Sequence, residues 1–246
     1  MSGSIFERHE LKYLIDSRQR TALVRAMRAH MIPDAYGEST ICNVYFDTPD
    51  FRLIRRSLEK PVYKEKLRLR SYGPVTSEQE VFLELKKKYS GVVYKRRISV
   101  KEYAATQFLS GNSPLAQPSQ IGREIEYFLH FYGDLMPAVY ICYDRTALFA
   151  KDDPDLRVTF DTNIRWRTDA LRLTAQPGGA QILPDGFSLM EIKTAAAIPM
   201  WLTELLTRQR IFQTSFSKYG RAYESMLRGS GEKHQNETHI GGSFCA

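Results

Sequence analysis

The chain has 246 residues, of which 35 are Lys or Arg and 28 are Asp or Glu, so its net charge is +7. With 43% hydrophobic residues and three scattered cysteines it can bury a core without disulfides, which excludes the disordered, collagen-like and disulfide-framework classes. The cysteines are expected to be free thiols. No segment has the apolar run of a signal peptide or a membrane span, so we expect a cytoplasmic protein with no membrane segment in this chain.

Helical patterns occur at six places along the chain. The first helix is expected after Asp16 and Ser17, where apolar residues recur at helical spacing, and Pro33 ends it. Further helices are expected after Pro49, over residues 101–109 and 119–132, after Pro199, and over residues 217–228. Residues 229–246 lose all periodicity, which predicts one folded domain over residues 1–228 and a disordered tail over residues 229–246.

The strands carry the functional signal, because charged residues fill one face of each. Residues 62–72 place Lys66, Arg68 and Arg70 on one face and leucines on the other, which is the two-residue period of a strand. Residues 80–87 and 156–161 repeat the pattern, and charged pairs two residues apart lie within residues 8–12, 95–97 and 191–193, with Tyr143 and Arg145 spaced in the same way. About eight strands separated by turns and short helices, rather than by regular crossover helices, predict an antiparallel sheet.

These strand faces hold far more cations than carboxylates. The cations are Arg8, Lys12, Lys66, Arg68, Arg70, Lys86, Lys95, Arg97, Arg145, Arg157 and Lys193, and the carboxylates are Glu10, Glu84, Asp161 and Glu191. Amphipathic helices need an apolar sheet surface to cover, so we expect the charged faces to turn inward. The prediction is an α+β fold with an antiparallel eight-stranded β-barrel and helices packed on the outside. Cations inside it repel one another unless a dense anion lies between them, which indicates phosphate chains.

The polar residues suit a linear polyanion bound together with a divalent metal. Arg clamps phosphate oxygens with two hydrogen bonds, and a carboxylate can hold Mg²⁺ or Mn²⁺, which keep water and phosphate oxygens as further ligands. The chain has neither a GxxxxGK[ST] loop nor a GxGxxG fingerprint, so side chains must hold the phosphates. Nucleic acid is not expected as a partner, because most strand aromatics lie out of phase with the cations.

Nine short motifs follow one another in an order that resembles a known family. They are Arg8-His-Glu-Leu-Lys-Tyr13, Tyr45-Phe-Asp-Thr48, Lys66-Leu-Arg-Leu-Arg70, Glu84-Leu-Lys86, Tyr94-Lys-Arg-Arg97, Tyr143-Asp-Arg145, Arg157-Val-Thr-Phe-Asp161, Met190-Glu-Ile-Lys193 and Phe216-Ser-Lys-Tyr219. Together they are similar to the VTC domain, the polyphosphate polymerase branch of the triphosphate tunnel metalloenzymes, a CYTH-like superfamily. The resemblance covers about residues 4–228.

The resemblance implies a basic tunnel in which the γ-phosphate of ATP is transferred to a growing polyphosphate chain with Mn²⁺ or Mg²⁺. It implies that the phosphate path is lined by Lys12, Arg68, Arg70, Lys86, Lys95, Arg145, Arg157, Lys193 and Lys218. It implies further substrate contacts from Arg8, Lys66, Arg97, Tyr143 and Ser217. Glu191 would be the metal ligand and Glu10 a second carboxylate. The expected ligands are ATP and polyphosphate, triphosphate or phosphate.

Two departures from the superfamily bear on the activity. Its hydrolytic members begin with Glu-x-Glu-x-Lys, whereas this chain has Arg8 in the first position, as the polymerases do, which disfavours activation of water. Polymerases often carry a Lys where this chain has Ser215. Two alternatives stay open: a hydrolase of triphosphate or nucleoside triphosphates, and a non-catalytic module that binds polyphosphate or nucleotides. Any contact with a membrane is expected to come through a partner protein.

Overall fold

The computed structural model describes residues 9–90, 92–115, 119–195 and 197–238. The strands are β1 (His9–Ile15), β2 (Met31–Asp47), β3 (Tyr63–Tyr72), β4 (Glu80–Tyr89), β5 (Val92–Lys101), β6 (Met136–Ala150), β7 (Arg157–Arg167), β8 (Ala180–Gln181) and β9 (Ser188–Thr194). The helices are α1 (Ser17–Met27), α2 (Arg52–Leu58), α3 (Glu102–Leu109), α4 (Gln120–Tyr132), α5 (Met200–Arg208) and α6 (Lys218–Thr238).

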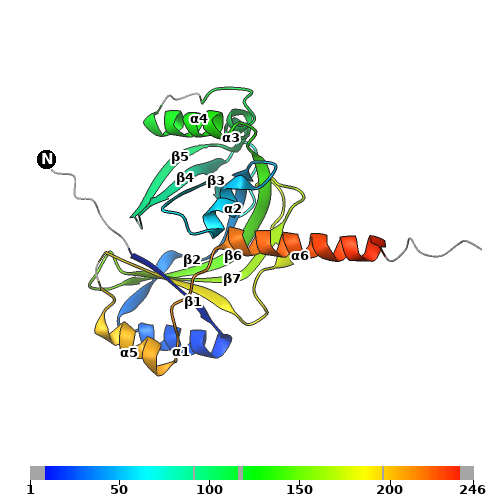
Figure 1. Cartoon of the computed structure of the whole chain (residues 1–246). Helices are drawn as coiled ribbons and strands as arrows, with labels where there is room; N and C mark the ends of the chain where they lie inside the picture. Colours follow the sequence, from blue (N-terminus) through cyan, green and yellow to red (C-terminus); the bar gives the residue numbers. More distant parts are fainter. Residues whose placement is uncertain (1–8, 91, 116–118, 196, 239–246) are drawn as a thin grey trace, which may run out of the picture.

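One antiparallel sheet forms the body of the fold. Its strands follow the order β1-β9-β7-β6-β2-β3-β4-β5, and β8 pairs with β7 outside that path. The predicted α+β class and the antiparallel sheet are confirmed. The sheet bends near β2 and β6, so that β3, β4 and β5 face β1, β7 and β9 across the interior (Figure 1). Within the described residues no ladder joins the edge strands β5 and β1, and side chains bridge that side instead.

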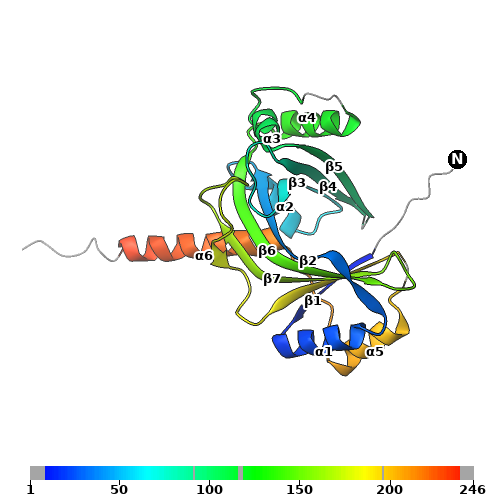
Figure 2. The ribbon, with the colours of Figure 1, turned by 180° about the vertical axis from the view of Figure 1, so that it is seen from behind.

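Two apolar clusters show that most helices cover the outer side of the bent sheet. Leu83 of β4 belongs to one cluster with Phe108 of α3, and α4 lies over the same strands. Val158 of β7 belongs to the other with Leu23 of α1 and Leu202 of α5. Figure 2 shows these helices above and below the bent sheet. Because alternate residues of a strand point to opposite sides, the charged faces turn inward, as predicted.

Helix α6 departs from this arrangement, because its first turn enters the interior of the sheet. Phe216 and Tyr219 share a third buried cluster with Ile141 of β6 and Leu189 of β9. The Tyr219 hydroxyl donates to the buried carboxylate of Asp47 at 2.8 Å, and the same carboxylate accepts two backbone N–H groups of α2. This anchoring holds the two residues between Phe216 and Tyr219 against the charged faces.

The chain beyond residue 228 is described only in part. Helix α6 continues to Thr238, and residues 239–246 lie outside the described residues, so the boundary after residue 228 stays a prediction. Cys42 and Cys142 are buried free thiols, as expected, while Cys245 lies outside the described residues. Among the helices that the structure describes, none combines the length and the apolar composition needed to span a bilayer.

Candidate functional site

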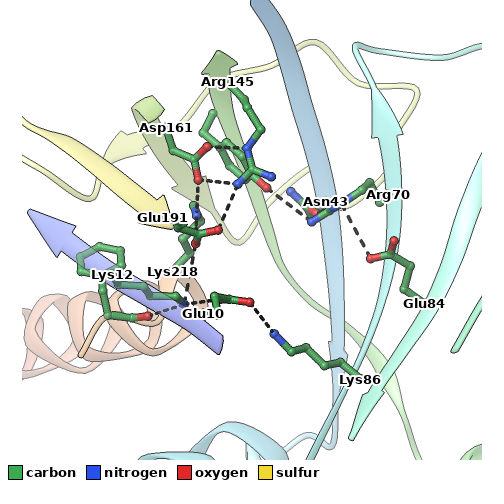
Figure 3. A network of polar contacts seen from close by, with 12 residues as sticks. Glu10, Lys12, Asn43, Arg70, Glu84, Lys86, Arg145, Asp161, Glu191 and Lys218 are labelled. Carbon is green, nitrogen blue, oxygen red and sulfur yellow. Dashed lines mark hydrogen bonds and ion pairs between the residues drawn. The ribbon is translucent and has the colours of Figure 1, made fainter. Parts of the chain in front are cut away.

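The inward-facing charges form two groups on opposite sides of the interior (Figure 3). We call the first the β3–β5 wall, which comprises Lys66, Arg68, Arg70, Glu84, Lys86, Lys95 and Arg97. We call the second the α6 wall, which comprises Glu10, Lys12, Arg145, Asp161, Glu191, Lys193 and Lys218, from β1, β6, β7, β9 and α6. Strand alternation explains the first wall, since its members occupy every second position of β3, β4 and β5.

A single carboxylate, that of Glu84, pairs with four cations of the β3–β5 wall. Its Oε2 lies 2.7 Å from Nη2 of Arg68 and 3.8 Å from Nε of Arg70. Its Oε1 lies 2.8 Å from Nζ of Lys95 and 3.1 Å from Nε of Arg97. Burial alone would raise the pKa of Glu84, but the surrounding cations hold that pKa well below its usual range. One negative charge faces four positive ones, so this wall can accept a further anion.

The α6 wall matches its cations with carboxylates more evenly. Arg145 donates to both oxygens of Asp161 at 2.6 and 2.7 Å, and Lys218 Nζ lies 2.6 Å from Oδ2 of the same residue. Glu191 Oε1 lies 3.4 Å from Nζ of Lys218 and 3.8 Å from Nζ of Lys12, and its Oε2 lies 3.5 Å from Nη2 of Arg145. Burial would raise the pKa of Glu191, yet these cations hold it well below its ordinary value. Glu191 is therefore ionised at neutral pH.

Glu10 connects the two walls. Its Oε1 lies 3.3 Å from Nζ of Lys12 on the same strand, and its Oε2 lies 3.6 Å from Nζ of Lys86 on β4. Burial would raise the pKa of Glu10, but Lys86 and Lys12 lower it to about 2. Since β1 and β4 share no ladder, this contact closes the interior through side chains (Figure 3).

Tyr143 of β6 lies where the walls meet. Arg70 donates from Nη2 to the Tyr143 hydroxyl at 3.4 Å and from Nε to Oδ1 of Asn43 at 3.0 Å. The centre of the Tyr143 ring lies 4.5 Å from Nζ of Lys218 and 5.2 Å from Cζ of Arg145. Because an aromatic face attracts cations, the ring gathers charges from β3, β6 and α6 at one place.

Two lysines of the site have no carboxylate within 4.0 Å in the described part of the chain. Lys66 Nζ donates to Oγ of Ser217 at 3.0 Å, and burial together with the charges of neighbouring lysines lowers its pKa to about 7. Burial lowers the pKa of Lys193 to about 8, although the nearby carboxylates partly offset it. A bound anion would favour the charged form of both side chains.

Two predicted site residues lie apart from these contacts. Arg157 lies opposite Lys193 in the β7–β9 register, but its Nη2 lies 3.2 Å from Oδ2 of Asp34 on β2, and its guanidinium covers the ring of Phe149. Arg157 therefore stands at the end of the α6 wall, with a carboxylate of its own. Arg8 lies outside the described residues. The other predicted residues belong to a wall or contact one.

Sequence reasoning assigned no role to several residues that hold the site together. Glu84 and Asp161 were counted as inward carboxylates, but their position as centres of ion pairs was not predicted. Asn43 was not singled out, and Tyr45 belongs to one of the nine motifs but was given no site role, although both lie opposite site arginines in the β2–β3 register. Arg68 donates to the Tyr45 hydroxyl at 3.0 Å. One signal could have found them: Asn43 and Tyr45 lie two residues apart on β2, so their side chains point to the same face. That signal is hard to read in the sequence because β2 also buries the residues of its other face.

The carboxylates fit a divalent metal only together with phosphate. In the described part of the chain, no three His, Cys, Asp or Glu side chains are grouped so as to hold a metal ion. Glu10 and Glu191 both lie within 4.0 Å of Lys12 Nζ, and the charge of Glu191 acts on the pKa of Glu10. Mg²⁺ and Mn²⁺ are commonly held by one or two carboxylates, with water and substrate phosphates as the other ligands. Glu10 and Glu191 suit a metal of that kind.

The family model described as the VTC domain matches residues 7–227. The chain belongs to the VTC domain family. Among curated proteins, this VTC domain is 23% identical to vacuolar transporter chaperone complex subunit 4 of Trypanosoma brucei brucei over 279 residues, and 22% identical to the subunit of the same name of Trypanosoma cruzi. Each match covers 92% of this chain but 35% of the relative, so the chain spans about a third of their length.

A solved structure shares the fold of this VTC domain. It is a Bacillus halodurans protein proposed to be an adenylate cyclase, with a TM-score of 0.54 and 15% sequence identity. The match covers 86% of this chain and 95% of that protein. At this identity the likeness shows the fold alone.

Proposed function

We propose that this protein is a polyphosphate polymerase, which transfers the γ-phosphate of ATP to the end of an inorganic polyphosphate chain with Mn²⁺ or Mg²⁺. The observation that carries the proposal is the meeting of cations from two walls at Tyr143, with Arg70 on one side and Arg145 and Lys218 on the other. Membership of the VTC domain family supports it. The proposal assigns the activity to residues 1–228 and a cytoplasmic location to the protein.

The walls supply what phosphoryl transfer needs most from a protein, which is alignment and stabilisation of charge. Arg68 and Arg70 offer planar guanidinium groups that match pairs of phosphate oxygens, while Lys86 and Lys95 add point charges from β4 and β5. Opposite them, Arg145 and Lys218 would stabilise the negative charge of the transferring group. An extended triphosphate between the walls would replace repulsion among cations by attraction to the anion.

The proposed reaction requires no general base. An oxygen of the terminal phosphate of the acceptor chain attacks the γ-phosphorus of ATP, and a new P–O–P bond forms. The bond from the γ-phosphorus to the oxygen that bridges the β- and γ-phosphates breaks, and ADP leaves with the electron pair on its β-phosphate. Because the acceptor oxygen is already anionic, the protein has only to hold two polyanions in line and lower their repulsion.

Glu191, with Glu10, would hold the divalent metal, which supplies further positive charge to the phosphate oxygens. Both carboxylates are ionised at neutral pH, because their pKa values are held low. Lys12 lies between them, and its Nζ also donates to the backbone oxygen of Phe216 at 2.9 Å. That contact ties the metal carboxylates to the segment that begins α6.

Incubation of the purified protein with ATP and Mn²⁺ tests the proposal, with separate measurement of polyphosphate, ADP and free phosphate. The expected products are polymer and ADP, with one ADP formed for each phosphate unit added to the polymer. Free phosphate without polymer would assign the protein to the triphosphatases instead. Tight binding of polyphosphate without any turnover would identify a binding module.

A further inference from the structure

The pairing of β3 with β4 places lysine opposite lysine on two successive rungs of the inner face. Lys66 lies opposite Lys86, and Lys64 lies opposite Lys88. On the next rung inward, the partner of the arginine is a carboxylate. Like charges directly opposite each other on antiparallel strands are destabilising. An anion between the lysines would remove that cost on both rungs.

The outer rung, formed by Lys64 and Lys88, lacks a compensating carboxylate. Among the described side chains, no Asp or Glu lies within 4.0 Å of either ammonium group. Lys64 Nζ donates to the backbone oxygen of Ser57 at 3.3 Å. Burial, with the charges of Lys88 and Lys12, lowers the pKa of Lys64. The free protein therefore holds positive charge here that its own residues do not neutralise.

The same rungs lead from the interior to the surface. The side chain of Arg70 is 11% exposed, that of Arg68 is 21% exposed and that of Lys86 is 43% exposed, while Lys88 is an exposed residue. A strand rises about 3.3 Å per residue, so Lys64 lies roughly 20 Å from Arg70 along β3. A linear polyanion that follows β3 outward from the arginines would pass the outer rung before it reached solvent.

We propose that Lys64 and Lys88 form a further phosphate-binding subsite, which holds the part of a linear polyphosphate chain that extends beyond the two walls. The inference rests on the proposed function, but it concerns the length of the bound chain and not the transfer step. A triphosphate held at the arginines ends before the outer rung, whereas a longer chain continues across it. The subsite therefore favours long chains over short ones.

The test compares two ligands and two charge-matched double variants. The Lys64→Gln/Lys88→Gln variant removes two charges from the outer rung, and Arg18→Gln/Arg25→Gln removes two from exposed positions of α1. Calorimetry measures the affinity for tripolyphosphate and for long-chain polyphosphate at one ionic strength. The outer-rung variant is expected to lose about tenfold or more in affinity for the long chain, with about twofold or less for tripolyphosphate, whereas the α1 variant keeps both.

The unliganded outer-rung variant is also expected to have a higher Tm than the wild type, because it relieves repulsion between Lys64 and Lys88. Equal losses for the two ligands, or an equal loss in the α1 variant, would overturn the subsite. A wild-type protein that bound neither ligand would overturn both the subsite and the proposed function. If the chain-length effect were present but ATP yielded no polymer, the subsite would stand and the polymerase proposal would fail.

Discussion

The two walls of the interior hold their cations in different ways. The β3–β5 wall sets Lys66, Arg68, Arg70, Lys86, Lys95 and Arg97 against Glu84, and the α6 wall sets Lys12, Arg145, Lys193 and Lys218 against Glu10, Asp161 and Glu191. The first wall thus carries most of the uncompensated positive charge. The second is close to neutral and contains the carboxylates that suit a metal. Under the proposed function, the first wall would mainly bind the polyanion and the second would mainly serve the transfer.

Loss of Glu84 should break the β3–β5 wall and have the largest effect on stability. The Glu84→Gln variant leaves four cations together without their buried counter-charge, so the free energy of unfolding is expected to fall by about 3–5 kcal/mol. Urea unfolding measures it. Added tripolyphosphate should restore part of the loss, because phosphate replaces the carboxylate. In the exposed pair with Lys101, Glu78→Gln should cost less than about 1 kcal/mol, and a similar cost at both sites would contradict the comparison.

Substitution of Glu191 should separate transfer from binding on the α6 wall. In Glu191→Gln the metal carboxylate is lost, so metal-dependent turnover is expected to fall by about 100-fold or more. Without metal, affinity for tripolyphosphate should be unchanged or higher, since one negative charge is gone. Turnover with Mn²⁺ and metal-free calorimetry measure the two effects, with Glu124→Gln of α4, which pairs with Arg96 of β5 away from both walls, as the control. Normal turnover in Glu191→Gln would remove the metal assignment.

Substitution of an arginine on the β3–β5 wall should weaken polyanion binding directly. Arg68→Ala removes charge-assisted hydrogen bonds, so affinity for tripolyphosphate is expected to fall about 10-fold to 100-fold. Arg18→Ala on the outer face of α1 is the matched control and should change affinity by about twofold or less. Calorimetry at constant ionic strength checks both. Equal losses would mean that the net charge, and not the inward-facing wall, determines binding.

The smallest expected effect concerns pH and Lys66. The groups that face this lysine are Lys12 of β1, Lys64 and Arg68 of β3, Lys86 of β4 and Ser217 before α6. With its pKa lowered to about 7, Lys66 loses its proton above neutrality, so affinity for tripolyphosphate should fall about fivefold between about pH 7 and pH 8.

Calorimetry at several pH values measures this dependence against Lys66→Arg, which stays charged and should show a flatter profile. Without the anion the sign reverses for stability, because the unfolded chain binds the proton more tightly than the folded one. The contribution of Lys66 to the free energy of unfolding therefore rises with pH from about 7 toward the ordinary lysine pKa. Identical binding profiles for the two proteins would contradict the role of Lys66.

The alternation of residues in β3 and β4 was enough to predict which side chains point inward. Leu67 and Leu69 had to be buried under helices, so the charged positions between them had to face the interior. The antiparallel sheet and the basic interior followed from that pattern. The contact between Glu10 and Lys86 that bridges β1 and β4 did not, because closure depends on the curvature of the whole sheet and not on any one strand.

Pairing between distant residues was beyond local patterns. Asp161 and Lys218 are far apart in the chain and meet because Phe216 and Tyr219 anchor the start of α6 inside the sheet. Arg157 has the same parity as Asp161, the inward carboxylate of its strand, yet it pairs with Asp34 near the start of β2. The placement of α6 decides the first contact, and the placement of the start of β2 decides the second.

Periodicity and short motifs within single strands were sufficient to predict the class of fold, the family and the inward direction of the charged faces. The sharing of charge became visible only in the folded chain, with one carboxylate for six cations on the β3–β5 wall and near neutrality on the α6 wall. The physical reason is that ion pairing depends on register and curvature, which bring together charges that lie far apart in the chain.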